Sequence, residues 1–254
     1  MDEVGLLNMA SLATGKVGGG KRIQEALTAL RDTPARREVG AIAFMMAYAA
    51  EAKGQLFQDL WALWVSGLKS GGYFVEFGAA SGVELSNSWL LEKKMGWRGI
   101  LAEPNPVFWD SLKANRTCDV STKCVFDRSG EQLEFLASHM PELSRIASLP
   151  AEDSHERRRL KRPQVITVET ISLNDLLIER GAPAVIDYLS LDTEGSELRI
   201  LEAFYFDRWD VRAITVEHNF TPLREALHDF LSERGYRREL EGVSLFDDWY
   251  VKVG

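Results

Sequence analysis

The sequence has few cysteines and no long hydrophobic run. Cys118 and Cys124 are the only cysteines among 254 residues, and no second Cys or His pair accompanies them at zinc-ligand spacing. This argues against a disulfide-rich secreted scaffold and against a zinc-finger fold. The longest apolar run, residues 39–50, is too short to span a bilayer, so we expect a buried helix there and no membrane span.

Basic residues are in the minority. The chain has 30 Lys and Arg against 38 Asp and Glu, a net charge of −8 that disfavours nucleic acid as a partner. The basic run at residues 155–162 is the exception, and it predicts either a solvated loop or a contact with an anionic substrate. Met1-Asp2-Glu3 is acidic where a secretion signal needs a basic start, so we expect a cytoplasmic protein.

Hydrophobic periodicity divides the chain near residue 70. Residues 1–70 predict a glycine-rich arm and helices that cover a cofactor cleft, and residues 71–254 alternate between strand and helix patterns. This alternation predicts an α/β, doubly wound, Rossmann-like sheet, largely parallel, with an N-terminal helical extension. Strands are predicted at 73–77, 98–103, 123–126, 165–168, 185–191, 213–216 and 243–253, and helices at 83–94, 107–115, 173–180, 196–204 and 222–235.

A glycine turn follows the first predicted strand. Gly78 and Gly82 are spaced as Gly-x-x-x-Gly and lack the middle glycine of a dinucleotide-binding loop. Glu76 precedes the turn and would repel a pyrophosphate, whereas a positively charged sulfonium cofactor suits an acidic strand end. A purely structural turn is the alternative interpretation.

A second carboxylate follows the next predicted strand. Glu103 lies about 20 residues beyond the glycine loop, the spacing at which an acidic residue accepts hydrogen bonds from ribose hydroxyls. Alternatively, Glu103 is a surface residue in front of Pro104.

Several segments together resemble the FkbM family of methyltransferases. The resemblance covers about residues 55–252, in the order typical of the family, and does not extend to residues 1–54. It includes Phe74-Val75-Glu76-Phe77-Gly78-Ala79 and Asp192-Thr193-Glu194-Gly195-Ser196-Glu197. The other matching segments are 55–60, 85–87, 101–104, 170–177, 186–191, 216–219 and 246–251.

The resemblance implies a class I methyltransferase that uses S-adenosylmethionine. It further implies O-methylation of a hydroxyl on a small molecule, a sugar or glycan or a secondary metabolite, and it leaves a homo-oligomer open. The alternatives are an NAD(P)-dependent oxidoreductase and a catalytically silent Rossmann module. The residues expected to bind the cofactor are Glu76, Gly78, Ser81, Gly82, Ser86, Asn87, Glu103, Pro104 and Asp192.

The expected catalytic residues are His218, Asp192 and Glu194, which follow the last two predicted parallel strands. A neutral imidazole at His218 suits the general base for a hydroxyl acceptor, with Asp192 orienting either the acceptor or the imidazole. Asp192, Glu194 and Glu217 also offer oxygen ligands for Mg²⁺, although no metal set is assigned from sequence. The alternatives are a buried structural histidine and an acidic helix start.

Overall fold

The computed structural model describes residues 34–149 and 163–253. The predicted arm at residues 1–20, the helix expected from residue 21 and the basic run at 155–162 therefore lie outside the described residues. Within the described ranges, no helix combines the length and the apolarity needed to cross a membrane.

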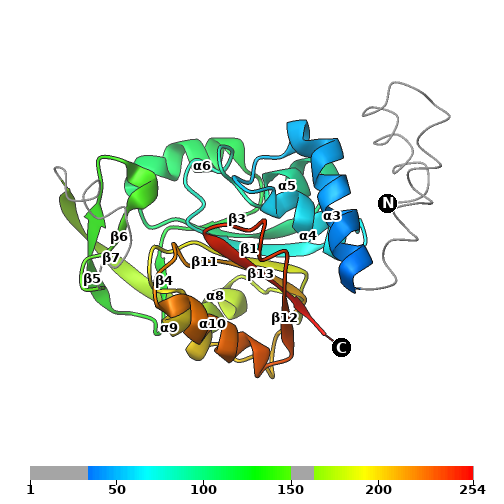
Figure 1. Ribbon diagram of the computed structural model, residues 1–254. Coiled ribbons are helices and arrows are strands. Elements are labelled where there is room, and N and C mark those ends of the chain that lie inside the picture. The colour runs from blue at the N-terminus through cyan, green and yellow to red at the C-terminus, as the bar shows by residue number, and fades with distance from the viewer. Residues whose placement is uncertain (1–33, 150–162, 254) are drawn as a thin grey trace.

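A seven-stranded sheet forms the centre of the fold (Figure 1). The chain passes from β1 to β2 and β3 on one side and later returns to β9 and β11 on the other. β9, β11, β2 and β3 extend it in parallel, and β13 pairs antiparallel with both β11 and β12. The α/β doubly wound fold class is thus confirmed. In spatial order the strands are β12 (Tyr236–Glu239), β13 (Asp247–Lys252), β11 (Ala213–Glu217), β9 (Tyr188–Leu191), β1 (Tyr73–Phe77), β2 (Arg98–Ala102) and β3 (Asp119–Ser121).

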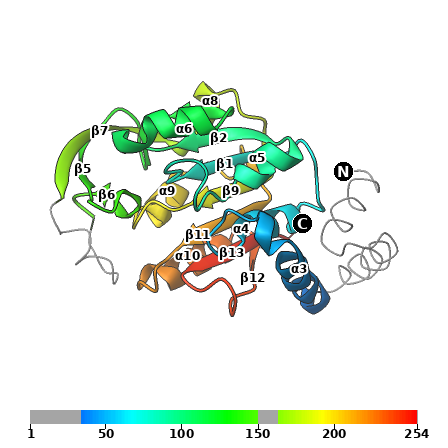
Figure 2. The ribbon, with the colours of Figure 1, turned by 90° about the horizontal axis from the view of Figure 1, so that it is seen from above.

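Helices cover both faces of this sheet (Figures 1 and 2). Strand residues alternate between the faces, so that Val75 packs with one apolar cluster and Phe74 with the other. The face that receives Phe74 carries α3 (Pro34–Tyr48), η2 (Ala49–Glu51), α4 (Gln58–Val65), α5 (Trp89–Met95), η3 (Pro106–Phe108) and α6 (Trp109–Asn115). The opposite face carries α8 (Leu173–Glu179), α9 (Glu197–Glu202) and α10 (Leu223–Ser232).

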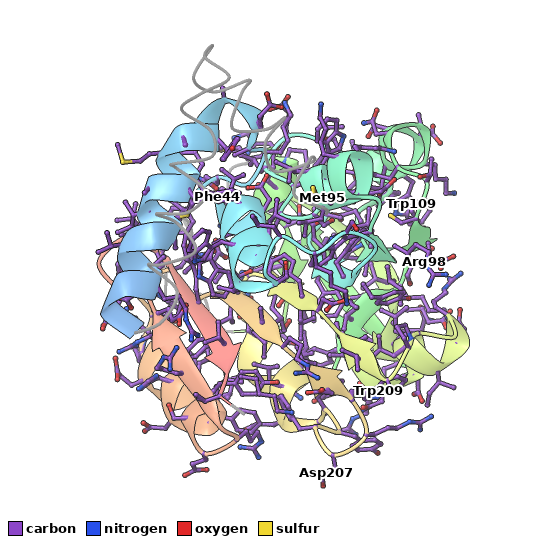
Figure 3. The ribbon with its side chains drawn as sticks, turned by 90° about the vertical axis from the view of Figure 1, so that its right-hand side faces the viewer. Phe44, Met95, Arg98, Trp109, Asp207 and Trp209 are labelled. Carbon is purple, nitrogen blue, oxygen red and sulfur yellow. The ribbon has the colours of Figure 1, made fainter. Side chains whose placement is uncertain are left out.

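Large aromatic side chains anchor each layer. Figure 3 shows Phe44 on α3 and Trp209 on opposite sides of the molecule, and the two residues belong to different apolar clusters. Trp61 on α4 is fully buried and lies 5.3 Å, ring to ring, from Trp249 on β13. The N-terminal helices therefore share a core with the sheet.

A second, four-stranded sheet lies beside the main one, and the sequence did not predict it. Its strands, in spatial order, are β4 (Cys124–Phe126), β7 (Gln164–Ser172), β5 (Gln132–Ala137) and β6 (Arg145–Ile146). The prediction that residues 123–126 and 165–168 extend the main sheet was therefore wrong. β5 was missed because most of its residues stay at least partly exposed when it pairs with β7, so its sequence contains no continuous apolar run.

Two further predictions of element boundaries were wrong. The helix expected at 83–94 begins only at Trp89, and the strand expected at 185–191 divides into β8 (Val185–Ile186) and β9. β8 pairs instead with the short β10 (Asp210–Val211). The edge strands β3 and β12 were not expected, since each is short and only partly buried.

Candidate functional site

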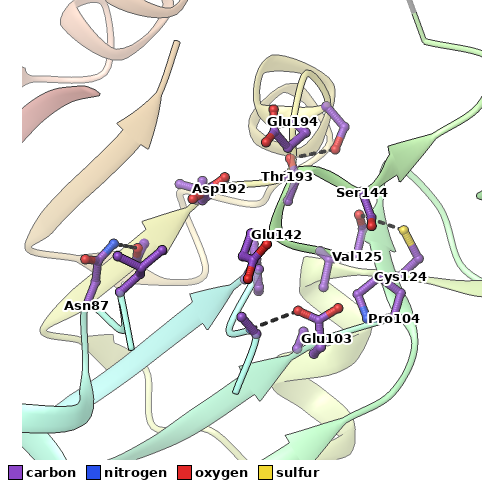
Figure 4. A pocket seen from close by; sticks show the side chains of 18 of the residues that line it. Asn87, Glu103, Pro104, Cys124, Val125, Glu142, Ser144, Asp192, Thr193 and Glu194 are labelled. Atoms are coloured by element: carbon purple, nitrogen blue, oxygen red, sulfur yellow. Dashed lines mark hydrogen bonds between the residues drawn. The ribbon is translucent and has the colours of Figure 1, made fainter. Parts of the chain in front are cut away.

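A pocket opens at the carboxyl ends of β1, β2 and β9 (Figure 4). The chain turns from one half of the sheet to the other between β1 and β9, which is the switch point where doubly wound sheets bind ligands. The space among the lining atoms is about 1010 Å³, part of it open to solvent. The small sheet adds Cys124, Val125, Phe135 and Ile146 to the lining.

Glu103 lines this pocket just beyond the end of β2. Its Oε2 accepts a hydrogen bond from the Ala80 amide at 2.9 Å, and its Oε1 accepts one from the Asn105 amide at 2.8 Å. Burial raises the pKa of Glu103 to about 7, although both amide hydrogen bonds oppose this shift. The two amides orient the carboxylate, whose remaining lone pairs can accept hydroxyl donors from a ligand.

The glycine turn brings β1 and β9 close together. Gly78 lines the pocket with a φ of +69°, and a Cβ placed there would lie 2.2 Å from the carbonyl oxygen of Asp192. Only glycine combines this left-handed backbone with so close an approach. Gly78 therefore makes the junction between the two halves of the pocket.

Four of the residues expected to bind the cofactor do not line the pocket. The Glu76 carboxylate accepts hydrogen bonds from the Asn87 amide at 2.8 Å, the Ser86 hydroxyl at 3.1 Å and the Ser88 hydroxyl. These bonds fold residues 86–88 back onto β1 and explain why the helix begins only at Trp89. Gly82 faces α6, where a Cβ would lie 2.6 Å from Leu112, and Ser81 offers its carbonyl oxygen to Asn115.

Asn87 is the residue that this folded loop presents to the pocket. Its Nδ2 donates a hydrogen bond to the Ser190 hydroxyl at 3.0 Å, while its buried Oδ1 has no hydrogen-bond partner among the described residues. Asn87, Gly78, Glu103, Pro104 and Asp192 are the predicted cofactor residues that the structure brings together around one cavity.

Three carboxylates gather beside the β9 and β11 end of the pocket, which Asp192 and Glu194 line and Glu217 does not. Ligand atoms of Asp192, Glu194 and Glu217 all lie within 4.8 Å of one another. Burial, with the nearby Glu194 charge, raises the pKa of Asp192 well above its usual range, and burial with the Asp192 charge does the same for Glu217. Protons held between these groups, or a bound cation, would offset this repulsion.

The loop after β9 is fixed by Glu197 in the first turn of α9. Its buried carboxylate accepts hydrogen bonds from the Thr193 amide and hydroxyl, both at 2.9 Å, and from the Gly195 amide at 3.1 Å. Glu194 adopts a φ of +58° within this loop and lines the pocket. Glu197 thus positions two of the expected catalytic carboxylates.

His218 does not line the pocket. Its Nδ1 accepts a hydrogen bond from the Phe220 amide at 3.0 Å, and its Nε2 lies 3.7 Å from a carboxylate oxygen of Asp248. Burial lowers the pKa of His218, and the Asp248 charge opposes this shift. With Nδ1 already accepting a bond, His218 is held between the Phe220 amide and Asp248, outside the pocket lining.

Sequence reasoning did not assign several of the residues that line the pocket. The Gln58 side chain donates a hydrogen bond at 2.7 Å to the carboxylate of Asp247, the first residue of β13. Burial raises the pKa of Asp247 to about 6. The resemblance covered both segments without indicating that they meet. The other unassigned polar lining residues include Gln55, Glu84, Glu142 and Ser144.

Comparisons with known proteins indicate the family of the chain. The family model described as the Methyltransferase FkbM domain matches residues 76–238, and no curated protein matches the chain. The structure of an FkbM methyltransferase from Methylobacillus flagellatus KT aligns over 92% of this chain and 59% of that one, with 13% identity and a TM-score of 0.46. This chain thus spans less than two thirds of the length of that protein.

Two further solved structures are similar. A precorrin-6y C5,15-methyltransferase from Geobacter metallireducens GS-15 has 12% identity and a TM-score of 0.42, over 76% of this chain and 85% of that one. A TehB-like SAM-dependent methyltransferase from Corynebacterium glutamicum has 10% identity and a TM-score of 0.39, over 87% of this chain and 100% of that one. Because the FkbM family model matches more than half of the sequence, the chain belongs to the FkbM methyltransferase family.

Proposed function

We propose that this protein transfers a methyl group from S-adenosylmethionine to a hydroxyl group on a sugar, a glycan or a secondary metabolite. Membership of a methyltransferase family implies this methyl donor. The single observation that carries the binding site is Glu103, whose carboxylate is fixed by the Ala80 and Asn105 amides beside the glycine turn. A carboxylate held at this place suits two ribose hydroxyls.

The residues around Glu103 fit the rest of such a donor. Pro104, Val125, Phe135 and Ile146 form an apolar wall that suits a flat purine ring. Toward β9 the lining becomes acidic, which suits an ammonium group and a sulfonium centre. No Lys, Arg or His of the described residues lines the pocket, so the pyrophosphate of NAD(P) finds no cation there.

Bound S-adenosylmethionine supplies an activated methyl group on a sulfonium. The chain's task is to align the acceptor hydroxyl and to take its proton. We assign the proton to Asp192, because Asp192 lines the pocket and His218 does not. The raised pKa of Asp192 makes its ionised form a stronger base than an ordinary carboxylate, and Glu194 lies beside it to orient the acceptor.

Mg²⁺ is the second ligand that the acidic trio fits. Asp192, Glu194 and Glu217 present oxygen ligands within 4.8 Å of one another, and hard divalent cations prefer such ligands. Methyl transfer measured with Mg²⁺ and again with excess chelator decides this use of the trio. Transfer that is unchanged by chelation assigns the trio to proton transfer alone.

Calorimetry on the full chain tests the donor. We expect S-adenosylhomocysteine, the product of methyl donation, to bind at micromolar strength and NADH not to bind. Binding of NADH alone would favour the oxidoreductase, and binding of neither ligand by folded protein would favour a silent module.

A further inference from the structure

Two glutamates at the mouth of the pocket have no partner among the residues that the structure describes. Glu84 belongs to the loop between β1 and α5, and Glu142 belongs to the short helix η4 (Pro141–Leu143). Both are exposed, both line the pocket, and within the described parts of the chain neither makes a hydrogen bond or an ion pair. Figure 4 shows Glu142 pointing into the space between Asp192 and Glu103.

These two carboxylates add to a pocket lining that already carries more acidic groups than the net positive charge of the donor requires. Glu103 faces the ribose hydroxyls in the proposed function, and the acidic trio of Asp192, Glu194 and Glu217 lies at the β9 and β11 end. The donor's sulfonium and amino acid groups together carry one net positive charge. The carboxylates among the described lining residues are Glu84, Glu103, Glu142, Asp192, Glu194 and Asp247, and no basic residue accompanies them.

We propose that Glu84 and Glu142 are specificity-determining residues that select an acceptor bearing an amino group, such as an amino sugar, over neutral and anionic acceptors. An ammonium group at the mouth would pair with two carboxylates that have no counter-charge within residues 34–149 and 163–253. A phosphorylated or nucleotide-linked acceptor would be repelled by the carboxylates of both glutamates. This inference rests on the proposed function, because it assigns the outer part of the same pocket to the acceptor.

The two glutamates come from different parts of the fold. Selection of the acceptor would therefore depend on two separate segments that meet at the mouth of the pocket. The Glu76 bonds that fold residues 86–88 hold the loop that carries Glu84, whereas η4 follows β5 of the small sheet. Neither residue belongs to the acidic trio, so a divalent cation held by that trio would leave Glu84 and Glu142 free to meet an acceptor.

The test uses the full chain with saturating S-adenosylhomocysteine and three matched probes. The probes are methyl glucoside, its 2-amino-2-deoxy analogue and its 6-phosphate, whose relative binding is read by ligand-observed NMR at low salt. We expect the amino probe to bind up to about fivefold better than the neutral one, the upper end of the gain from exposed charge pairs, and the phosphate to bind worst. The preference should shrink at high salt, because mobile ions screen exposed charges.

Substitution then assigns the preference to the two residues. The double variant Glu84→Gln with Glu142→Gln should bind the amino and neutral probes equally and should bind S-adenosylhomocysteine as before. Glu233→Gln, an exposed glutamate beyond the end of α10, is the matched control and should keep the preference.

The inference is overturned if the three probes show no order by charge, if none binds, or if the phosphate binds best. The last outcome would favour the anionic substrate that the basic run at residues 155–162 left open. Failure to bind S-adenosylhomocysteine in the same sample would instead contradict the proposed function.

Discussion

At the β2 end of the pocket a single carboxylate, Glu103, is held by two backbone amides, whereas at the β9 end three carboxylates lie within 4.8 Å of one another. The first arrangement fixes one side chain in one orientation and suits recognition of a ligand. The second stores mutual repulsion and raises the pKa of Asp192 and Glu217, which suits proton transfer or cation binding. In the proposed function, therefore, the same residue type binds the donor at one end of the pocket and takes part in the reaction at the other.

The largest effect is expected from removing the charge at the reactive end. Asp192→Asn should lower the rate of methyl transfer by about 10²–10⁴-fold, the range typical of a lost general base. Its affinity for S-adenosylhomocysteine should stay within a few-fold, because Glu103 and its amides are untouched. Single-turnover transfer and calorimetry separate the two quantities. A rate close to that of the unmodified chain would move the proton acceptor elsewhere.

The junction between the two ends should be the next most sensitive point. Gly78→Ala places a Cβ against the Asp192 carbonyl and forces a side chain into a left-handed backbone. The free energy of unfolding should fall by about 3 kcal/mol, as measured by urea denaturation. Gly96→Ala is the control, since Gly96 has a similar φ of +65° with open space around it. Equal losses in both variants would mean that backbone strain alone, and not the close approach, matters at Gly78.

A smaller effect is expected at the recognition end. Glu103→Gln should weaken S-adenosylhomocysteine binding at pH 8 by about 1–3 kcal/mol, the usual loss for hydrogen bonds to a charged acceptor. The melting temperature without ligand should change little, because the variant loses one amide acceptor while it also removes a buried charge. Normal affinity with a large drop in melting temperature would make Glu103 purely structural.

The smallest effect is expected behind the reactive end. His218→Asn should leave methyl transfer within about threefold, because the imidazole lies outside the pocket and its Nδ1 is already bonded. The measurement is the same single-turnover assay. A loss of 10²-fold or more in a folded variant would restore the base that we first expected from sequence.

Part of the pocket could be predicted from the amino-acid sequence, and part could not. The central strands and the position of Glu103 could be predicted, because buried parallel strands leave apolar runs and ligands meet their carboxyl ends. Glu76 shows the limit, because it lies within β1 and not beyond its end. Its side chain turns to the face opposite Val75, where the Ser86 hydroxyl and the Asn87 amide donate hydrogen bonds to its carboxylate. Only the fold of residues 83–88 decides this.

Pairing between distant segments explains the remaining differences. β5 and β7 form a separate sheet because they pair with each other, and a short alternating pattern does not reveal its partner. His218 was expected at the site because it follows a central strand, but bonds from its own backbone and that of Asn219 to Phe246 hold this turn beside the start of β13. Gln58 and Asp247, which do meet in the pocket wall, are separated by most of the chain.

The pKa of Glu103 allows the central assignment to be tested directly. Ribose hydroxyls donate to the ionised carboxylate, so binding should favour loss of the proton that burial retains up to a pH of about 7. Calorimetry of S-adenosylhomocysteine binding in buffers of different ionisation enthalpy should detect release of about one proton at pH 6 and none at pH 8.5. Well below the pKa of Glu103, the affinity should fall about tenfold for each unit by which the pH is lowered. In Glu103→Gln this release should disappear. Binding without proton release at pH 6, or the same release in the variant, would contradict the assignment of Glu103 to the donor's ribose.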